Sequence, residues 1–343
     1  MKKIRIFLLF SGLVLIFVFL YNYYNTLFYK KKFNFSTIKI KEGDNAHKLK
    51  AFFINHGVLR NNLDLYLYKV YIKINPPILK TGVYEIPQNI TIDSLFKYIE
   101  RGKVKLIKVT IPEGARSEEI AYIFKKKLGL SYNKFMKIVL DSNSVYKFKI
   151  GFGKNLRGFL MPETYYFPLD ATEEDVIKKM TQEFVKYVNK ISKNSPMIKK
   201  YSIYDIIILA SIIEKEAVVD KERPIIAGVF YNRLKKGMLL QADPTVRFAT
   251  GNFKKPITKK DLRFNSPYNT YVTKGLPPTP ICNPGKKSIY AAFYPAKVDY
   301  LFFVAKFDGS GEHFFSKSNK EHNKYRIIAK RNLDSLRIHK IHR

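Results

Sequence analysis

A glutamate interrupts the apolar face of a helical stretch at residues 202–217. Apolar residues recur there at helical spacing, Ser202 can cap the first turn, and Asp205 stands at the capping-box position. At about 100° per residue, five apolar or small residues fall within about 60° of Glu214. They are Ile207, Ala210, Ser211, Ala217 and Val218. Because several of these side chains are small, we expect a hollow beside the carboxyl group.

Such surroundings would make Glu214 a proton donor. An unpaired carboxyl group in an apolar site favours its protonated form, because desolvation penalises the charge. General-acid chemistry on a glycosidic bond needs a carboxylic acid that stays neutral near neutral pH. The alternative is that Glu214 points to solvent or pairs with a basic residue such as Arg233. Glu216 is the rival acid, but it lies about 200° further round the helix and cannot share the site of Glu214.

The N-terminus predicts a membrane anchor. Lys2, Lys3 and Arg5 precede residues 6–29, an uncharged run of about 24 residues, long enough to cross a bilayer of about 30 Å. A cleaved signal peptide is the competing interpretation, but the run is too long and no small-x-small cleavage site follows it. The basic flank favours a cytoplasmic N-terminus, although Lys30–Lys32 weaken that signal. We therefore expect a single-pass protein of the cytoplasmic (inner) membrane whose remaining chain is extracytoplasmic or periplasmic.

The net charge of +34 first suggests a nucleic-acid-binding protein. The basic residues are spread along the chain, however, and no zinc-finger, RNP or KH signature is present. We interpret the charge as a solvated surface compatible with anionic lipids and acidic wall polymers, and expect no nucleic-acid partner. Cys282 is the only cysteine and is expected to be a small buried residue. The histidines lack a metal-ligand spacing, so no metal or cofactor is expected.

The predicted elements give an α+β fold with a transmembrane helix, a small strand–helix module and a helix-rich domain with a short antiparallel sheet. We expect the anchor at 1–29, a tether at 30–35, the module at 36–108 and the helix-rich region at 109–343. A strand, Glu-Gly turn and helix occur at 40–52 and again at 111–123, and units of this size resemble LysM peptidoglycan-binding modules. The expected strands are 37–41, 82–86, 104–111, 300–305 and 313–316, and the clearest expected helices are 46–55, 63–72, 92–100, 202–217 and one from about Pro224 to 236.

Several sequence blocks follow one another in a characteristic order. They lie at 109–114, 158–165, 209–216, 229–234, 237–238, 240–246, 266–271, 275–278, 283–285, 294–296 and 313–315. In this order they resemble the endolytic murein transglycosylase family, also called YceG-like, over most of residues 38–325. One departure is Ala115-Arg116, where the family often has a Gly-Trp pair or a small residue. Since the chain has no tryptophan, the glycan affinity of the N-terminal module is in doubt more than catalysis is.

The resemblance implies a lytic transglycosylase, a carbon–oxygen lyase acting on polysaccharides. It implies cleavage of the β-1,4 bond between N-acetylmuramic acid and N-acetylglucosamine in nascent peptidoglycan, which leaves 1,6-anhydro ends and terminates strand elongation. Glu214 would protonate the leaving oxygen and then accept the proton of the muramoyl C6 hydroxyl as that oxygen attacks C1. Water is not a reactant, so no second carboxylate is needed. The family pattern favours Glu214 and leaves Glu216 to a structural ion pair.

The resemblance also suggests residues that contact sugar and peptide. Amides and hydroxyls can bond to ring substituents, and tyrosines can stack on sugar faces. The alternative is that these segments are turns that hold the fold. Arg233 could neutralise an acid near the site or bind a peptide carboxylate, His313 could be a core residue on a strand, and 283–285 is most simply a turn. The candidate substrate-binding residues are Gln241, Asp243, Thr245, Tyr268, Asn269, Thr270 and Tyr271.

Two function classes compete. The first is the membrane-anchored enzyme acting on peptidoglycan strands, with penicillin-binding proteins or other cell-wall synthases as family-level partners. The second is a non-catalytic peptidoglycan-binding scaffold of the cell-wall synthesis machinery. Cleavage of glycan by the purified protein discriminates between them.

Overall fold

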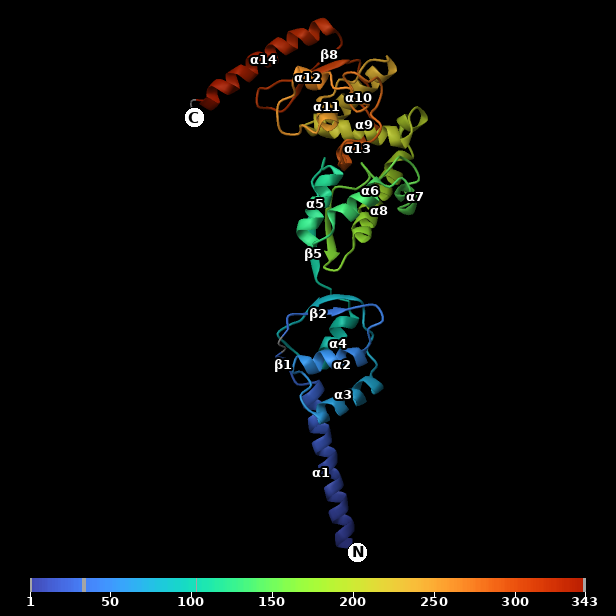
Figure 1. Ribbon diagram of the computed structural model, residues 1–343, viewed down its shortest axis with the longest axis vertical. Coiled ribbons are helices and arrows are strands. Elements are labelled where there is room, and N and C mark those ends of the chain that lie inside the picture. The colour runs from blue at the N-terminus through green and yellow to red at the C-terminus, as the bar shows by residue number, and fades with distance from the viewer. Residues whose placement is uncertain (1, 33–34, 103, 342–343) are drawn as a thin grey trace. The chain divides into compact units, whose positions relative to one another are not determined.

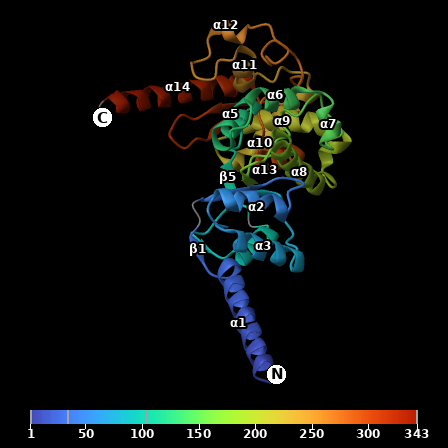
Figure 2. The same cartoon turned by 60° about the horizontal axis from the view of Figure 1, so that its bottom comes forward.

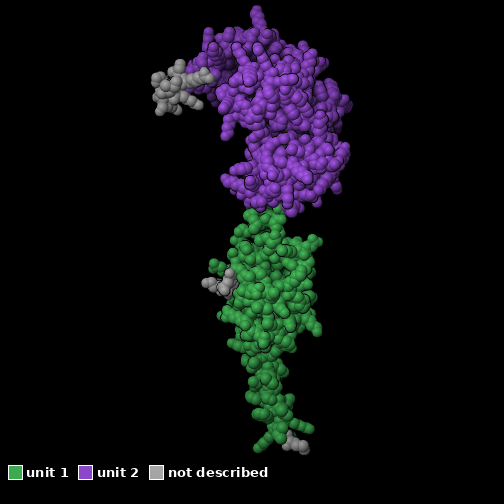
Figure 3. Space-filling model, viewed as in Figure 1, with its two compact units in different colours: residues 1–107, 166–171 green, residues 108–165, 172–343 purple. Residues whose placement is uncertain are grey.

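The computed structural model describes residues 2–32, 35–102 and 104–341, and its packing separates two compact units (Figures 1 and 3). Unit 1 comprises Met1–Ile107 and Tyr166–Ala171, and unit 2 comprises Lys108–Tyr165 and Thr172–Arg343. The return of 166–171 to the first unit was not predicted. Residues 33–34 of the predicted tether lie outside the described residues, and the functional division predicted from the sequence stays a prediction.

Unit 1 begins with the apolar helix α1, Lys2–Leu27, which is long and apolar enough to cross a membrane. Its apolar side chains are exposed along most of its length, as expected for a helix that faces lipid. The last turn differs, because Thr26 and Leu27 are buried. Thr26 Oγ1 donates a hydrogen bond of 2.8 Å to Asp64 Oδ1. The end of the anchor is therefore part of the core of unit 1.

The rest of unit 1 is the predicted strand–helix module. β2 pairs antiparallel with β3, with Ile38 opposite Tyr84. The helices bury a shared aromatic core that includes Phe53, Tyr68 and Phe96. The likeness to LysM modules stays a prediction. The elements are β1 (Lys31–Lys32), β2 (Thr37–Ile40), α2 (Ala46–Asn55), α3 (Asn62–Ile74), β3 (Gly82–Glu85), β4 (Asn89–Ile90) and α4 (Ile92–Glu100).

Unit 2 is built around α9, Ile203–Glu216. Every side chain from Ile206 to Ile213 is buried, and α10, α11 and α13 pack against this helix (Figure 2). The elements before α9 are β5 (Leu106–Thr110, which begins in unit 1), α5 (Ser117–Leu128), α6 (Tyr132–Leu140), α7 (Ser144–Lys147), β6 (Thr164–Pro168, which pairs with β5 and ends in unit 1), α8 (Glu173–Ser192) and η1 (Pro196–Lys199). Those after it are η2 (Asp220–Glu222), α10 (Arg223–Lys235), α11 (Asp243–Thr250), α12 (Lys259–Leu262) and α13 (Lys286–Phe293).

The C-terminal part contains the predicted antiparallel hairpin. β7 (Phe302–Ala305) pairs with β8 (His313–Ser316), and α14 (Asn319–Ile341) packs on both strands. The fold is thus α+β with short antiparallel sheets, as predicted. Three short helices were not predicted: α11, at whose start a turn was the alternative, α12 and α13. Pro244 stands in the first turn of α11, where proline is favoured because its missing N–H is not needed.

Candidate active site around helix α9

Helix α9 carries two carboxyl groups near its C-terminal end, Glu214 and Glu216. Its N-terminus has the predicted capping box, in which Asp205 N donates to Ser202 Oγ (3.1 Å) and Ser202 N donates to Asp205 Oδ2 (3.2 Å). The helix remains regular to Glu216, and Ala217 is its C-cap. Because the two glutamates are two positions apart, they point to different sides of the helix. Each therefore has its own environment.

Glu214 lies in a closed, charged environment. Its side chain is 6% exposed and lies 3.6 Å from the Arg223 guanidinium, measured from Oε2 to Nη1. Gly285 N donates a 2.9 Å hydrogen bond to the same oxygen. The expectation of an unpaired carboxyl at this position is wrong, since Glu214 is ion-paired. Its partner is Arg223 rather than Arg233.

A second carboxyl group, Glu113, lies beside this cluster. Burial raises its pKa, and the negative charge of Glu214 raises it further. Gly285 lies directly beside it, and a Cβ atom there would displace the Glu113 carboxyl group. The Glu-Gly turn at 113–114 and the turn at 283–285 therefore meet at the Glu214 side of α9. No spacing in the sequence indicated this meeting, because the two turns are far apart in the chain.

The turn at 283–285 does more than reverse the chain. The side chain of Asn283 is fully buried. Its Oδ1 accepts from Leu160 N (3.0 Å) and its Nδ2 donates to Ala115 O (2.9 Å). Cys282, just before it, is buried as expected, and burial raises the pKa of its thiol. Gly114 N also donates to Asn283 O (3.0 Å), so this turn connects the blocks at 109–114 and 158–165 and positions the Gly285 N–H that donates to Glu214.

Glu216, the rival acid, lies in a different environment. It is partly buried, and this burial raises the pKa of its carboxyl group to about 8. The negative charge of Asp243 raises the pKa as well, while the Arg233 guanidinium lowers it. A carboxyl group with this pKa is mostly protonated at neutral pH and can act as a general acid. The surroundings of Glu216 thus favour a carboxyl group that stays protonated near neutral pH, which the sequence had predicted for Glu214.

Glu216 and Asp243 together line two hollows. The first, the arginine hollow, has a volume of about 370 Å³. In its lining, the Arg116 guanidinium stacks on Phe253, with the guanidinium carbon 3.6 Å from the centre of the ring. The arginine hollow is lined by Arg116, Glu119, Lys215, Glu216, Asp243, Pro244, Arg247, Phe248, Phe253 and Ile281.

The second, the strand hollow, has a volume of about 380 Å³ and opens beside the β7–β8 hairpin. Tyr271 Oη donates a 2.7 Å hydrogen bond to Asp243 Oδ1, and burial raises the pKa of the Tyr271 phenol. The strand hollow is lined by Glu216, Arg233, Leu240, Gln241, Asp243, Tyr271, Phe303, Val304, Ala305, Phe307, His313, His322 and Arg326. Glu216 thus has open space of similar size on two sides.

The candidate substrate-binding residues divide into two groups. Gln241, Asp243 and Tyr271 line the strand hollow. Thr245, Asn269 and Thr270 are buried, and their side chains bond inside the protein. The Oγ1 atoms of Thr245 and Thr270 are 2.8 Å apart, while Asn269 Nδ2 donates to Phe264 O (2.8 Å).

The buried group therefore shapes the loop that presents Tyr271. Tyr268, the remaining candidate, is partly exposed. Its hydroxyl forms a 2.9 Å hydrogen bond with Thr279 Oγ1, and its ring packs on Phe248.

Arg233 is buried and connects the strand hollow to the hairpin. It donates to Leu301 O (2.6 Å), to Leu240 O (2.9 Å) and to Gln241 Oε1 (3.4 Å). Its charge lowers the pKa of Glu216, so it partly neutralises an acid near the site, one of the two roles considered for it.

His313 is also buried and lies on β8, as a core residue would. Its Nδ1 lies 2.7 Å from Glu222 Oε2, and its backbone N donates to Glu222 Oε1 (3.0 Å). Sequence reasoning did not identify Glu222, Arg223 or Glu113, since only tertiary contacts bring them to these positions.

Comparison with known proteins assigns the chain to a family. A model of the YceG-like family matches residues 38–327. The chain belongs to the YceG-like family. An endolytic murein transglycosylase of Bacillus subtilis (strain 168) is 34% identical over 302 residues, which cover 84% of this chain and 82% of that protein. One of Streptococcus pneumoniae (strain ATCC BAA-255 / R6) is 27% identical over 318 residues, which cover 84% of this chain and 57% of that protein.

A solved structure agrees with this assignment. A crystal structure of a yceG-like protein from Listeria monocytogenes matches with a TM-score of 0.59 at 34% identity, covering 86% of this chain and 99% of that chain. In this YceG-like protein, the family match contains both carboxyl groups of α9 and every residue that lines the two hollows. Helix α1 lies outside the matched range.

Proposed function

We propose that this YceG-like protein is a membrane-anchored lytic transglycosylase of peptidoglycan. It cleaves the β-1,4 bond between N-acetylmuramic acid and N-acetylglucosamine within nascent strands, leaves 1,6-anhydro ends and so terminates elongation. The names of the bacillary and streptococcal relatives support murein as the substrate. The observation that carries the proposal is the Glu216 carboxyl group, with its pKa raised to about 8, between two hollows.

Glu216, rather than Glu214, is the acid in this proposal. Glu214 lies against Arg223 and accepts from Gly285 N, so both contacts of its carboxyl group are made within the protein. A group that must release and regain a proton during each turnover is better served by the Glu216 environment, where burial favours the neutral form. Glu214 then has a positioning role, because it holds the 283–285 turn against the end of α9.

The reaction needs one carboxyl group in two states. Protonated Glu216 donates its proton to the glycosidic oxygen as the bond from that oxygen to C1 of the muramoyl residue breaks. The Glu216 carboxylate then accepts the proton of the C6 hydroxyl while O6 bonds to C1, and this step regenerates the acid. The Asp243 carboxylate faces the same space and stabilises the positive charge that develops at C1. No water is consumed.

The two hollows support cleavage within a strand rather than at its end. An internal bond has sugars on both sides, and Glu216 has open space on both sides. In the strand hollow, Gln241 and Asp243 offer polar groups, and Tyr271 offers a ring face. Thr245, Tyr268, Asn269 and Thr270 support the loop behind these groups and contribute to substrate binding through it.

The location follows from the anchor and the substrate. Helix α1 holds the protein in the cytoplasmic membrane with its N-terminus inside, so that unit 2 acts on the outer side where peptidoglycan is made. Nascent strands are cut beside the enzymes that polymerise them, and penicillin-binding proteins are therefore the expected protein partners.

Product analysis tests the reaction. The full-length protein in detergent is incubated with uncross-linked peptidoglycan strands, and the products are identified by mass spectrometry. We expect 1,6-anhydro-ended fragments from the wild type and none from Glu216→Gln. Ordinary reducing ends would indicate a hydrolase instead. Glycan binding without any cleavage by the wild type would support the scaffold.

A matched control distinguishes loss of the catalytic acid from a general effect of removing one negative charge. Glu85→Gln makes the same change in unit 1, at a side chain that is 63% exposed, and is expected to retain full activity. Anhydro products from Glu216→Gln at the wild-type rate would remove Glu216 from the mechanism, and their loss in Glu214→Gln with folding intact would return the role to Glu214.

A further inference from the structure

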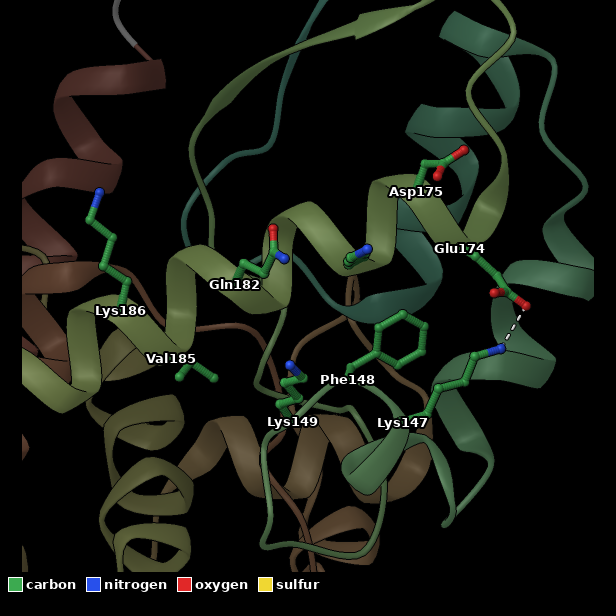
Figure 4. Close-up of a pocket in the computed structure, with 9 residues that line it drawn as sticks. Lys147, Phe148, Lys149, Glu174, Asp175, Gln182, Val185 and Lys186 are labelled. Carbon is green, nitrogen blue, oxygen red and sulfur yellow. Dashed lines mark hydrogen bonds and ion pairs between the residues drawn. The ribbon is translucent and has the colours of Figure 1, made fainter. Parts of the chain in front are cut away.

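A third hollow, of about 650 Å³, lies between α8 and the turn that follows α7 (Figure 4). We call it the lysine hollow, because Lys147, Lys149, Lys178 and Lys186 line it. Phe148 and Val185 give it an apolar lining. It shares no residue with the two hollows at Glu216. It is therefore a separate feature of unit 2.

The positive charge of this hollow is not neutralised by its own acids. Glu174 accepts from Lys147 Nζ at 2.7 Å. Asp175 caps α8, where its carboxylate accepts from Thr172 N at 2.9 Å. Among the residues that the structure describes, Lys149, Lys178 and Lys186 form no ion pair. Three like charges around one hollow favour a ligand that carries several negative charges.

The helix α8 sets a spacing for these charges. Lys178, Gln182 and Lys186 follow one another at intervals of four residues, so they lie along one face of the helix. Eight residues of helix separate the two lysines by about 12 Å. Figure 4 shows Gln182 and Lys186 along α8, with Lys149 on the facing turn. A ligand that meets both lysines must therefore be extended.

Lys149 occupies a position where glycine is usual. Its φ is 59°, in the left-handed region. Ile150 N donates to Val145 O (2.8 Å) and Lys149 N to Tyr146 O (3.0 Å), the pattern that closes a helix with a left-handed residue. Within the described chain, the other non-glycine residues with positive φ are Gln241 and Phe307, and both line the strand hollow. Strained residues of this kind gather at functional sites.

We propose that the lysine hollow binds an extended polyol-phosphate chain, a polymer of phosphodiester-linked units. Lysine holds phosphate as a point charge, whereas a fixed carboxylate favours the arginine fork. Lys147 is already paired with Glu174, so Lys149, Lys178 and Lys186 remain for the phosphates. The apolar lining of the hollow suits the carbon segments between successive phosphates.

The test measures binding of a fluorescent glycerol-phosphate octamer to the full-length protein in non-ionic detergent. Lys149→Gly is the decisive variant, because glycine removes both the charge and the backbone strain. We expect a higher melting temperature together with about 5-fold weaker binding, the effect of one lost charged contact. Lys178→Ala combined with Lys186→Ala should weaken binding about 20-fold, and added salt should weaken binding of the wild type.

Controls separate this site from the general basic surface. Lys125→Ala combined with Lys126→Ala removes two exposed lysines of α5, which lie outside the lysine hollow, and should leave the affinity within about 2-fold. An equal loss in this control, or no binding at all, overturns the proposal. Binding of poly-L-glutamate in preference to the octamer, with the same response to the variants, would assign the hollow to an acidic protein segment instead. Release of anhydro fragments should be unchanged in Lys149→Gly.

Discussion

The two sides of α9 place the same residue type in opposite environments. On one side, Glu214 lies against Arg223 and the Gly285 N–H, in contact with turns that are far apart in the sequence. On the other, Glu216 opens onto two hollows, where burial and Asp243 raise its pKa to about 8. The difference teaches that two nearby glutamates on one helix can divide structural and chemical roles, because the groups packed around each carboxyl decide what it can do.

The largest expected effect is a difference between Glu216→Gln and Glu214→Gln in the rate of anhydro-end formation. Glu216→Gln removes the transferable proton and should lower the rate of anhydro-end formation by about 10³-fold, a typical contribution of general-acid catalysis. Glu214→Gln keeps an acceptor for Gly285 N and should lower the rate by less than about 10-fold. Initial rates measured with soluble strands decide the order. The reverse order would make Glu214 the acid and Glu216 the supporting residue.

The next effect is on stability. Arg223→Gln leaves the Glu214 carboxylate buried without its cation, and should reduce the free energy of unfolding by about 3 kcal/mol. Lys105→Gln breaks an exposed ion pair with Glu85 and should change it by less than about 1 kcal/mol. Denaturant unfolding of the full-length protein followed by circular dichroism measures both. Equal effects of the two variants would show that the Glu214–Arg223 pair does not stabilise the fold more than an exposed ion pair does.

A pH profile tests the Glu216 side. The acid acts in its protonated form, so activity should fall as pH rises through about 8. Because the folded-state pKa lies above the unfolded value, the stability from this group is also present at low pH and lost as pH rises through about 8.

Asp243→Asn removes the charge that raises this pKa, while its amide oxygen can still accept from Tyr271 Oη. The alkaline fall in activity should therefore move to lower pH. Asp308→Asn, an exposed turn residue outside both hollows, should not move it. A fall that stays in place or moves upward in Asp243→Asn would contradict this account.

The smallest effect compares two tyrosines. Tyr271→Phe loses the hydrogen bond to Asp243 but keeps the ring, and should raise the KM for glycan about 3-fold, as expected for one modest hydrogen bond. Tyr268→Phe loses a hydrogen bond to Thr279 behind the loop, and should lower the melting temperature while raising KM less than Tyr271→Phe does. An unchanged KM in Tyr271→Phe would remove its hydroxyl from substrate binding.

Local patterns predicted much of the fold. The capping box of α9, the bounds of α2 and α4, and the hairpin of β7 and β8 follow from caps, periodicity and turn residues that act over a few positions. The helices α11, α12 and α13 were missed because they are short and each begins beside a turn residue, Pro244, Thr258 or Gly285. Tertiary packing overrides local preference there.

For the candidate site, the sequence by itself determined that α9 presents carboxyl groups, that an apolar N-terminal helix precedes the fold, and which blocks belong to the YceG-like family. It did not determine which glutamate is paired. Arg223, Gly285 and Asp243 come from three separate segments, and their positions around α9 arise only when those segments pack. Protonation depends on burial and on nearby charges, which are properties of the packed chain, so only the tertiary structure distinguishes Glu214 from Glu216.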